Sequence, residues 1–380
     1  MHIAILTTAH PWDDVRVRTK FADSFVAAGD RVTWIGPDKA FFATSRHGNI
    51  HWRLCRARDG KVGRIVQIPR LVRAAIRIEG ADYFYVPDPD ALPIALLAAR
   101  VTGSSVVFDI HEEFHGGLLQ RLFGKRLGSL TAPLVKWAIS ALAGRADIVT
   151  AVSRTILDMY SGTHAARQVV HNAPPAAFAR GERGKRIADG APMRIFHGKA
   201  LATNGTPQIL DAAAKLRGRD AQFVMIPYGM PGGPAFWPDF EDALSSRDAE
   251  ANVALAEPVQ HSRIPGLLQS CDVGIIAYGR TLGESSLPNR FFEYIAAGLP
   301  VIVPSYATEM ASIVKDHRIG LTVDAEDPES IAGGIVWMLE NREEAMKMGE
   351  RARELFVDRY SWEPTFARLR RFMSETRAGR

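Results

Sequence analysis

The chain alternates short apolar runs with longer segments in which apolar residues recur every three or four positions. In the first half the apolar runs predict strands near residues 2–8, 31–37, 82–88, 105–111 and 146–153. Helical spacing occupies the segments between them, near residues 15–29, 66–80, 91–103 and 118–144. Strands that alternate with helices are typical of a parallel sheet with crossover helices, so this half is predicted to be a doubly wound α/β domain.

The pattern breaks in the middle of the chain and then restarts. Residues 176–192 are charged, contain glycine and lack apolar periodicity, so they are predicted to be a linker. Beyond them strands are expected near residues 193–198, 221–229, 272–279, 300–305 and 320–323, and a closing helical run from residue 328. Two α/β domains of similar size are therefore predicted, which suits a length of 380 residues.

Polar residues gather where the predicted strands end. The segments TTAHPWDD, DIHEEFHGG and HGKALATNG each follow a strand and are rich in His, Asp, Asn and Gly. In open parallel sheets, ligands bind beyond the carboxyl ends of the strands. We expect the strand ends of the two domains to face each other across a cleft, with the functional residues beside it.

The segment SSLPNRFFEYIAAGLPVIVPS, residues 285–305, places one carboxylate on an apolar helix. Pro288 and Asn289 predict a turn that starts the helix, with Glu293 in its first turn. One interpretation is that Glu293 only complements the helix dipole, which contributes ~0.3–1 kcal/mol. The other is that a buried carboxylate requires partners, and that the vicinal hydroxyls of a ribose supply them. Backbone N–H groups at the helix start and Arg290 would then suit a phosphate.

This segment resembles the nucleotide-sugar signature of retaining GT-B glycosyltransferases of family 4. The likeness extends to AHPWDDVRVRTKFADSFVAAGDRV, to VVFDIHEE, to VVHNAPP and to RYSWEPTFARLRRF near the end. It implies an α/β, GT-B fold with two Rossmann-like doubly wound domains. Residues 1–175 would bind the acceptor and residues 193–361 the nucleotide sugar, with a C-terminal helix, residues 362–380, packed back on the first domain.

The resemblance implies transfer from a UDP- or GDP-sugar with retention of anomeric configuration, and neither a metal nor a cofactor. The leaving nucleoside diphosphate develops negative charge, so fixed cations near it lower the barrier. Lys199 and Arg290 are the expected cations, with Arg280 as a further candidate. Asp88–Asp90, DPD, is expected to form a turn rather than a metal site.

The family's pattern also assigns individual residues. Glu293 carries over as the ribose ligand, and His111 as the first-domain histidine that points at the donor sugar, beside Lys199 and Arg290 as catalytic residues. The remaining donor-binding candidates are Glu284, Ser285, Ser286, Leu287, Asn289 and Gly198. The acceptor-side candidates are His10, Asp13, Asp14, Arg16 and Glu112, and Glu112 has the alternative role of capping the segment that follows.

Charge is distributed unevenly along the chain. Residues 1–190 hold 26 Lys and Arg against 17 Asp and Glu, or +9, and the remainder holds 21 against 25, or −4. The first domain is expected either to face an anionic partner or only to carry a solvated basic surface. Helical segments that mix arginine with apolar residues suit an anionic membrane leaflet, or again a solvated face. Nucleic acid is not expected as a partner.

The composition is compatible with a cytoplasmic protein, or with a peripheral one on the inner face of the plasma membrane. The cysteines, Cys55 and Cys271, show no metal-ligand spacing and are expected to be reduced. No run approaches the ~18 apolar residues of a membrane span, and the first residues predict a strand rather than a signal peptide.

The expected function is assembly of a cell-surface polysaccharide or glycoconjugate. Two alternatives remain: a non-catalytic GT-B subunit that binds nucleotide sugars, and a glycosyltransferase acting on a small natural product. The sequence does not indicate the base, the donor sugar, the acceptor, the linkage or the oligomeric state.

Overall fold

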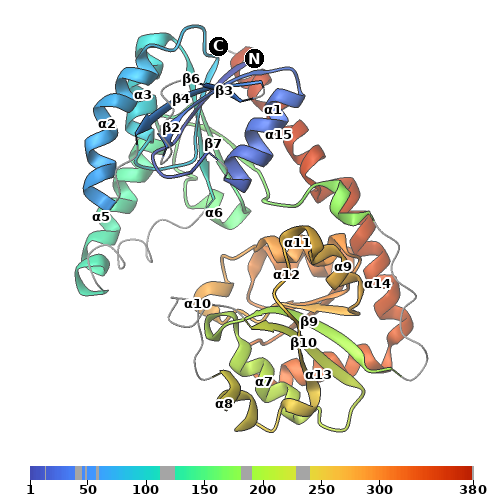
Figure 1. The fold of residues 1–380 in the computed structure, drawn as a ribbon. Helices are drawn as coiled ribbons and strands as arrows, with labels where there is room; N and C mark the ends of the chain where they lie inside the picture. Colours follow the sequence, from blue (N-terminus) through green and yellow to red (C-terminus); the bar gives the residue numbers. More distant parts are fainter. Residues whose placement is uncertain are drawn as a thin grey trace. The chain divides into compact units, whose positions relative to one another are not determined.

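The computed structural model describes residues 1–12, 14–38, 45–47, 49–56, 60–111, 125–180, 191–227 and 240–378. The chain divides into two compact domains (Figure 1). The first contains Met1–Asn172 and Thr365–Arg380, and the second contains Ala173–Pro364. Each domain is built around one sheet, with helices packed against it.

The sheet of the first domain has eight strands in the order β3-β4-β2-β1-β5-β6-β7-β8. β3 is antiparallel to β4, and all other neighbours are parallel. The bounds are β1 His2–Leu6, β2 Arg31–Asp38, β3 Ser45–His47, β4 Ile50–Arg56, β5 Tyr83–Val86, β6 Ser105–Ile110, β7 Ile148–Ala151 and β8 Ala166–Val169. The strand order reverses at β1, so the carboxyl ends of β1 and β5 form a switch point where ligands commonly bind.

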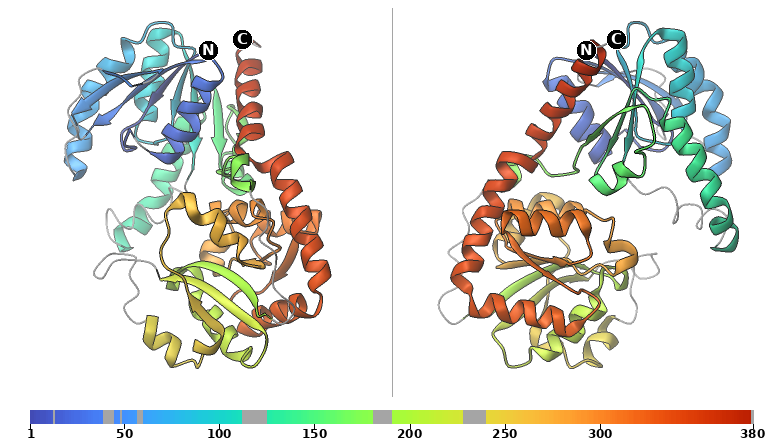
Figure 2. Two further views of the ribbon diagram at one scale, coloured as in Figure 1. Left: turned by 45° about the vertical axis from the view of Figure 1, so that its right-hand side comes forward. Right: turned by 180° about the vertical axis from the view of Figure 1, so that it is seen from behind.

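Both faces of this sheet are covered (Figures 1 and 2). Helices α2 Gly60–Ile76, α3 Leu92–Thr102 and α5 Lys125–Ala143 pack with Phe84 and Phe108 in one apolar core. On the other face Tyr85 of β5 contacts Phe21 and Phe25, which lie in the π-helix η1 Val15–Ala22 and in α1 Asp23–Ala27. The short helix α6 Arg154–Asp158 follows β7. Burial on both faces explains why the strands are apolar throughout.

The last helix, α15 Trp362–Ala378, contributes its later turns to the first domain. Phe366 contacts the ring of Phe25 at 4.9 Å between centroids. The hydroxyl of Tyr83 donates to the carbonyl of Met373 at 2.5 Å. Arg370 donates to both carboxylate oxygens of Asp30, at 2.7 and 2.9 Å. The two chain ends therefore lie close together in this domain (Figure 2).

The second domain has a six-stranded parallel sheet in the order β11-β10-β9-β12-β13-β14. The strands are β9 Met193–Ala200, β10 Ala221–Pro227, β11 Val253–Leu255, β12 Val273–Ile275, β13 Val301–Pro304 and β14 Gly320–Val323. The helices are α7 Thr206–Lys215, α8 Phe240–Ser245, α9 Ile264–Gln269, α10 Arg280–Gly283, α11 Asn289–Ala296, α12 Thr308–His317, α13 Pro328–Glu340 and α14 Arg342–Leu355. Short turns of helix are η2 Ala176–Ala179, η3 Ala202–Asn204, η4 Glu250–Asn252, η5 His261–Arg263 and η6 Phe356–Tyr360.

Two apolar cores enclose this second sheet. Helices α7 and α13 contribute to one core, and α11, α12 and α14 contribute to the other. Because β9 and β12 are central strands, the residues at their carboxyl ends lie between these two layers of helices.

The structure differs from the sequence prediction in several elements. The edge strands β3 and β11, and β4 next to β3, were not predicted, although Ile50, Trp52 and Leu54 alternate with polar residues in β4. Within the predicted linker, residues 176–179 instead form the 3-10 helix η2, because Phe178 packs in an apolar core of the second domain. Residues 181–190 of the linker lie outside the described residues.

Candidate active site

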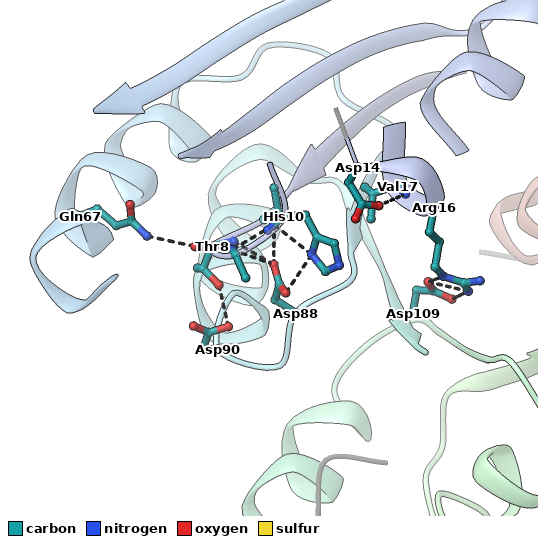
Figure 3. A network of polar contacts seen from close by, with 11 residues as sticks. Thr8, His10, Asp14, Arg16, Val17, Gln67, Asp88, Asp90 and Asp109 are labelled. Atoms are coloured by element: carbon teal, nitrogen blue, oxygen red, sulfur yellow. Dashed lines mark hydrogen bonds and ion pairs between the residues drawn. The ribbon is translucent and has the colours of Figure 1, made fainter. Parts of the chain in front are cut away.

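The polar network of the first domain is centred on Asp88, which follows β5 (Figure 3). Its carboxylate accepts hydrogen bonds from the hydroxyl of Thr7, at 2.5 Å, and from the backbone N–H of Thr8, at 2.9 Å. It also lies 3.1 Å from Nδ1 of His10. Burial alone would raise the pKa of Asp88, but His10, Thr7 and Thr8 outweigh it and lower the pKa to about 2. Asp88 is thus an ionised anchor for the loop after β1.

Asp90 assists this anchor, because it accepts a hydrogen bond from the hydroxyl of Thr8 at 2.6 Å. The backbone N–H of Ala91 donates to the carbonyl of Asp88 at 3.1 Å, as in a turn. The segment DPD therefore does form a turn, and its carboxylates also hold the neighbouring loop, a role that the sequence analysis did not predict. Clusters of three or more His, Cys, Asp or Glu side chains that could hold a metal ion are absent from the described part of the chain.

Arg16 and Asp109 form a buried ion pair beside this network (Figure 3). Nε and Nη2 of Arg16 donate to Asp109 at 3.0–3.2 Å, and Thr150 donates to the same carboxylate at 2.8 Å. Burial alone would raise the pKa of Asp109, but the charge of Arg16 lowers it below its usual range. Nη1 of Arg16 is buried and has no hydrogen-bond partner among the described residues.

His10 and His111, from the loop after β1 and the end of β6, meet edge to face. Their ring centroids are 5.1 Å apart and the ring planes are inclined by 68°. The structure thus brings together three of the predicted residues: His10, Arg16 and His111. Asp14 lies nearby and caps η1 by accepting from the N–H of Val17 at 2.6 Å. Asp13 and Glu112 lie outside the described residues.

In the second domain the end of β9 bulges at His197 and Gly198. The register against β10 shifts there, and Gly198 has φ = +85°. A side chain at Gly198 would place its Cβ 3.4 Å from the hydroxyl of Tyr294. Positive φ is unfavourable for residues with a side chain, so glycine is needed here. The bulge turns the carbonyl of His197 toward α11, where it accepts from Tyr294 at 3.1 Å and from Arg290 at 3.2 Å.

Arg290 lies in the first turn of α11 with part of its guanidinium uncommitted. Nη1 donates to the carbonyl of His197, and the guanidinium carbon lies 4.6 Å from the ring centroid of Tyr278. Nε and Nη2 are buried without a hydrogen-bond partner among the residues that the structure describes. Buried donors of this kind are rare in folded proteins unless a ligand or water satisfies them. The guanidinium is therefore poised to bind an anion.

His197, whose carbonyl accepts from this arginine, has a fully buried imidazole. Burial, reinforced by the charge of Arg290, lowers the pKa of His197 to about 3, so the ring is neutral. Its Nε2 lies 2.9 Å from the hydroxyl of Thr206. His197, Tyr278 and Tyr294 were not predicted as site residues, because only the bulge and the position of α11 bring them to Arg290.

Glu293 is the fifth residue of α11, which begins at Asn289 after the N-cap Pro288. Glu293 therefore lies in the second turn, and the prediction that it occupies the first turn is wrong. The interpretation that Glu293 only complements the helix dipole is weakened, because the dipole effect falls off within the first turn. Its side chain is half-buried rather than fully enclosed.

The loop before α11 carries the other donor-side candidates. Glu284 and Asn289 are exposed, Ser285 and Ser286 are half-buried, and Leu287 is buried. Ser286 donates its hydroxyl to the carbonyl of Leu282. These residues lie in one stretch of chain that leads directly to Arg290.

The two remaining cations differ in their surroundings. Lys199 follows Gly198 and is exposed. Arg280 is bound to Asp324 at 3.2 Å and to Glu326 at 3.3 Å, and it stacks on Tyr306. Because two carboxylates already balance its charge, Arg280 is a poorer anion-binding candidate than Arg290.

Comparison with protein families gives two matches that together span most of the chain. Residues 181–355 match the family described as "Glycosyl transferases group 1", and residues 15–175 match "Glycosyltransferase Family 4". A GDP-mannose-dependent alpha-(1-6)-phosphatidylinositol monomannoside mannosyltransferase of Mycolicibacterium smegmatis is 22% identical over 306 residues, which cover 76% of each protein. A D-inositol 3-phosphate glycosyltransferase of Corynebacterium glutamicum is 26% identical over 196 residues, 50% of this chain and 45% of that protein.

Solved structures agree in fold at lower identity. Sucrose-phosphate synthase from Thermosynechococcus elongatus superposes with a TM-score of 0.73 at 15% identity and full coverage of both chains, 100% of each. Anabaena HepE, in complex with UDP and glucose, gives a TM-score of 0.72 at 14% identity, covering 99% of this chain and 100% of that one. The predicted α/β, GT-B class with two Rossmann-like domains is confirmed.

Proposed function

Because its two halves match glycosyltransferase family 4 and the group 1 glycosyl transferases, the chain belongs to this glycosyltransferase family, and we propose that its donor is a nucleoside-diphosphate sugar. The donor would be a UDP- or GDP-sugar and the acceptor a hydroxyl group, in assembly of a cell-surface polysaccharide or glycoconjugate. GDP-mannose dependence in the mycobacterial relative and bound UDP in HepE support this donor class.

One observation carries the proposal: two N–H donors of Arg290, Nε and Nη2, are buried without a hydrogen-bond partner among the described residues. They lie at the start of α11, beside the ends of β9 and β12. A pyrophosphate supplies oxygens for both donors, and the fork of an arginine matches that geometry. The backbone N–H groups at the start of α11 and the side chain of Lys199 would add positive potential to the same anion.

In the proposed reaction the acceptor oxygen forms a bond to the anomeric carbon as the bond from that carbon to the pyrophosphate oxygen breaks. The acceptor proton passes to the departing phosphate on the same face, so the anomeric configuration is retained. Arg290 and Lys199 stabilise the negative charge that develops on the leaving group, and the protein needs no nucleophile of its own. We propose that no metal ion takes part.

The donor proposal is tested by melting-temperature shifts with UDP, GDP and their sugars. We expect one nucleotide to raise the melting temperature of the native protein, because a ligand that binds only the folded state stabilises it. Glu293→Ala should abolish most of this shift, since its carboxylate would bind the ribose hydroxyls. Glu284→Ala, an exposed carboxylate in the preceding loop, should keep more of it. A full shift in Glu293→Ala would remove Glu293 from the site.

The stereochemical proposal requires the product itself. Proton NMR of the first-formed product should show the anomeric configuration of the donor, in buffer that contains EDTA. An inverted product, or activity restored only by a divalent cation, would contradict the proposed reaction.

A second proposal concerns an anionic membrane surface as partner. No helix among the described residues is long and apolar enough to cross a membrane. In α5, however, Leu134 and Trp137 are 65% and 69% exposed, next to the exposed Lys136. In α2 the exposed Arg70 and Arg73 follow Val66, which is 46% exposed. Apolar side chains among cations favour insertion at an anionic leaflet.

Flotation with vesicles tests this surface. We expect binding to vesicles that contain phosphatidylglycerol, weaker binding in high salt, and little binding to phosphatidylcholine alone. The variant Leu134→Ser/Trp137→Ser should bind several-fold more weakly. Leu97→Ser/Val101→Ser, which alters similarly exposed residues of α3, serves as the matched control. Equal binding by both variants would contradict the assignment of α5.

A further inference from the structure

Two histidines of the first domain touch each other but face different charges. The ring centroids of His10 and His111 are 5.1 Å apart. His10 belongs to the loop after β1, which Asp88 anchors, whereas His111 directly follows β6, which carries the Arg16–Asp109 ion pair. Neighbouring histidines in different fields are held in different protonation states.

His10 faces mainly carboxylates. Its Nδ1 lies 3.1 Å from Asp88, whose ionised carboxylate can only accept, so Nδ1 carries the hydrogen. Burial would lower the pKa of His10, but Asp88, with Asp14 and Asp109, outweighs burial and raises it. Three further donors, from Thr7, Thr8 and Ala9, fix the position of Asp88. The fold therefore fixes the orientation of His10 and favours its protonated form.

His111 is in the opposite situation. Burial lowers its pKa, and the cations Arg16 and His10 lower it further, against the raising effect of Asp109 and Asp88. The surroundings therefore favour the neutral form of His111 next to a histidine whose protonated form is favoured. The charged groups that act on His10 are Asp88, Asp14 and Asp109, whereas those that act on His111 are Asp109, Arg16, His10 and Asp88.

We propose that the Asp88–His10 pair is a positioning device for His111, which holds the His111 ring in its substrate-binding orientation and keeps it neutral. The proposal rests on the proposed function and on the role that the family resemblance assigns to His111, a contact with the donor sugar. A sugar ring that loses its leaving group develops positive, oxocarbenium-like charge. A neutral imidazole can bind a hydroxyl of that sugar, whereas an imidazolium at the same place would repel the charge. Asp88 and His10 are positioning residues in this scheme and need not touch the sugar.

The pair is tested by NMR titration of the histidine rings, assigned with single variants. In the wild-type protein His10 should titrate above, and His111 below, the usual range of histidine. His10→Gln should raise the titration midpoint of His111, because a cation at its edge is removed. Asp88→Asn should lower the midpoint of His10, and circular dichroism should confirm that each variant is folded. His164→Gln changes an exposed histidine of the same domain and should leave both midpoints in place.

Kinetics supply the functional half of the test. His10→Gln should lower kcat/KM for the donor about 10- to 100-fold, by analogy with the loss of a residue that orients a metal-ligating histidine. The acidic limb of its pH profile should move to higher pH, which a purely structural defect would not do. An unchanged His111 midpoint in His10→Gln, or unchanged kcat/KM, overturns the positioning role. If the midpoints behave as expected but the wild-type protein transfers no sugar from any donor, the proposed function fails instead.

Discussion

Replacing Arg290 with alanine is expected to lower kcat/KM for sugar transfer by about a thousandfold while the second domain stays folded. Removal of one donor from a site that stabilises developing negative charge typically costs about 10²–10³ in rate, and removal of an arginine from phosphoryl chemistry costs about 10³–10⁵. Two buried donors of Arg290 have no protein partner among the described residues, so alanine breaks no hydrogen bond of theirs. Its third contact, with the carbonyl of His197, is also lost, but that carbonyl still accepts from Tyr294.

The measurement compares steady-state transfer with the melting temperature of each variant. Arg290→Lys keeps the charge but loses the planar fork, so its activity should lie between those of the wild type and Arg290→Ala. Arg280→Ala is the matched control, since Arg280 belongs to the same domain but is bound to Asp324 and Glu326. If Arg290→Ala keeps more than about a tenth of the wild-type kcat/KM, Arg290 does not stabilise the leaving group.

Replacing Arg16 with methionine is expected to lower the free energy of unfolding of the first domain by about 3–5 kcal/mol, the usual cost of removing one partner of a buried ion pair. Asp109 is fully buried and would keep its charge without its main counter-ion. Methionine fills a similar volume, so a cavity contributes little to the loss. Hydrogen exchange of the β6 amides measures the effect, with the β12 amides of the second domain as an internal control.

The pH dependence of this loss follows from Asp109. In the wild-type protein its pKa is lowered by Arg16, so the pair contributes fully above the unfolded pKa of about 3.9 and is lost as the pH falls through the folded pKa. In Arg16→Met the largest effect that opposes burial is removed, so the pKa of Asp109 should rise. The difference between the two proteins should therefore be largest near pH 7 and shrink toward pH 4.

A double variant separates the charge from the packing. Arg16→Met/Asp109→Leu removes both charges and should recover much of the lost stability, because paired hydrophobic replacements of a buried ion pair are often neutral. A single variant that loses less than about 1 kcal/mol would mean that water reaches the pair and that it is not truly buried.

The fold was largely predictable because the strands of both sheets, except β3, are parallel, and most of them are buried. Strands such as β1 and β13 are mostly apolar runs between segments with helical periodicity, and this contrast can be recognised from the sequence alone. The sequence did not predict β4, which lies next to the edge strand β3, because its alternation is broken by Cys55 and because charged residues follow it. Local periodicity does not report which strand lies at the edge of a sheet, since that depends on tertiary order.

Residues of the candidate site could be predicted only where they belong to a recognisable sequence motif. The segment around α11 indicated Glu293 and Arg290, and the helix begins at Asn289 as predicted, although Glu293 lies in its second turn rather than its first. The role of Asp88 as an anchor and the pairing of Arg16 with Asp109 join residues that are 80 or more positions apart. Such contacts follow from the reversal of strand order at β1, which no local pattern encodes.

Because α15 contributes to the first domain, that domain is built from two segments of the chain, Met1–Asn172 and Thr365–Arg380, which the second domain separates in the sequence. Phe25, Asp30 and Tyr83 receive their partners Phe366, Arg370 and Met373 only after the ribosome has made the whole second domain. A fragment that ends at residue 172 would expose the aromatic ring of Phe25 and leave the carboxylate of Asp30 without its arginine. On the ribosome, the first domain should therefore complete its fold only after the second domain has been synthesised. To separate the two domains, the last helix must be attached to the first domain, because cutting the chain at one place does not suffice.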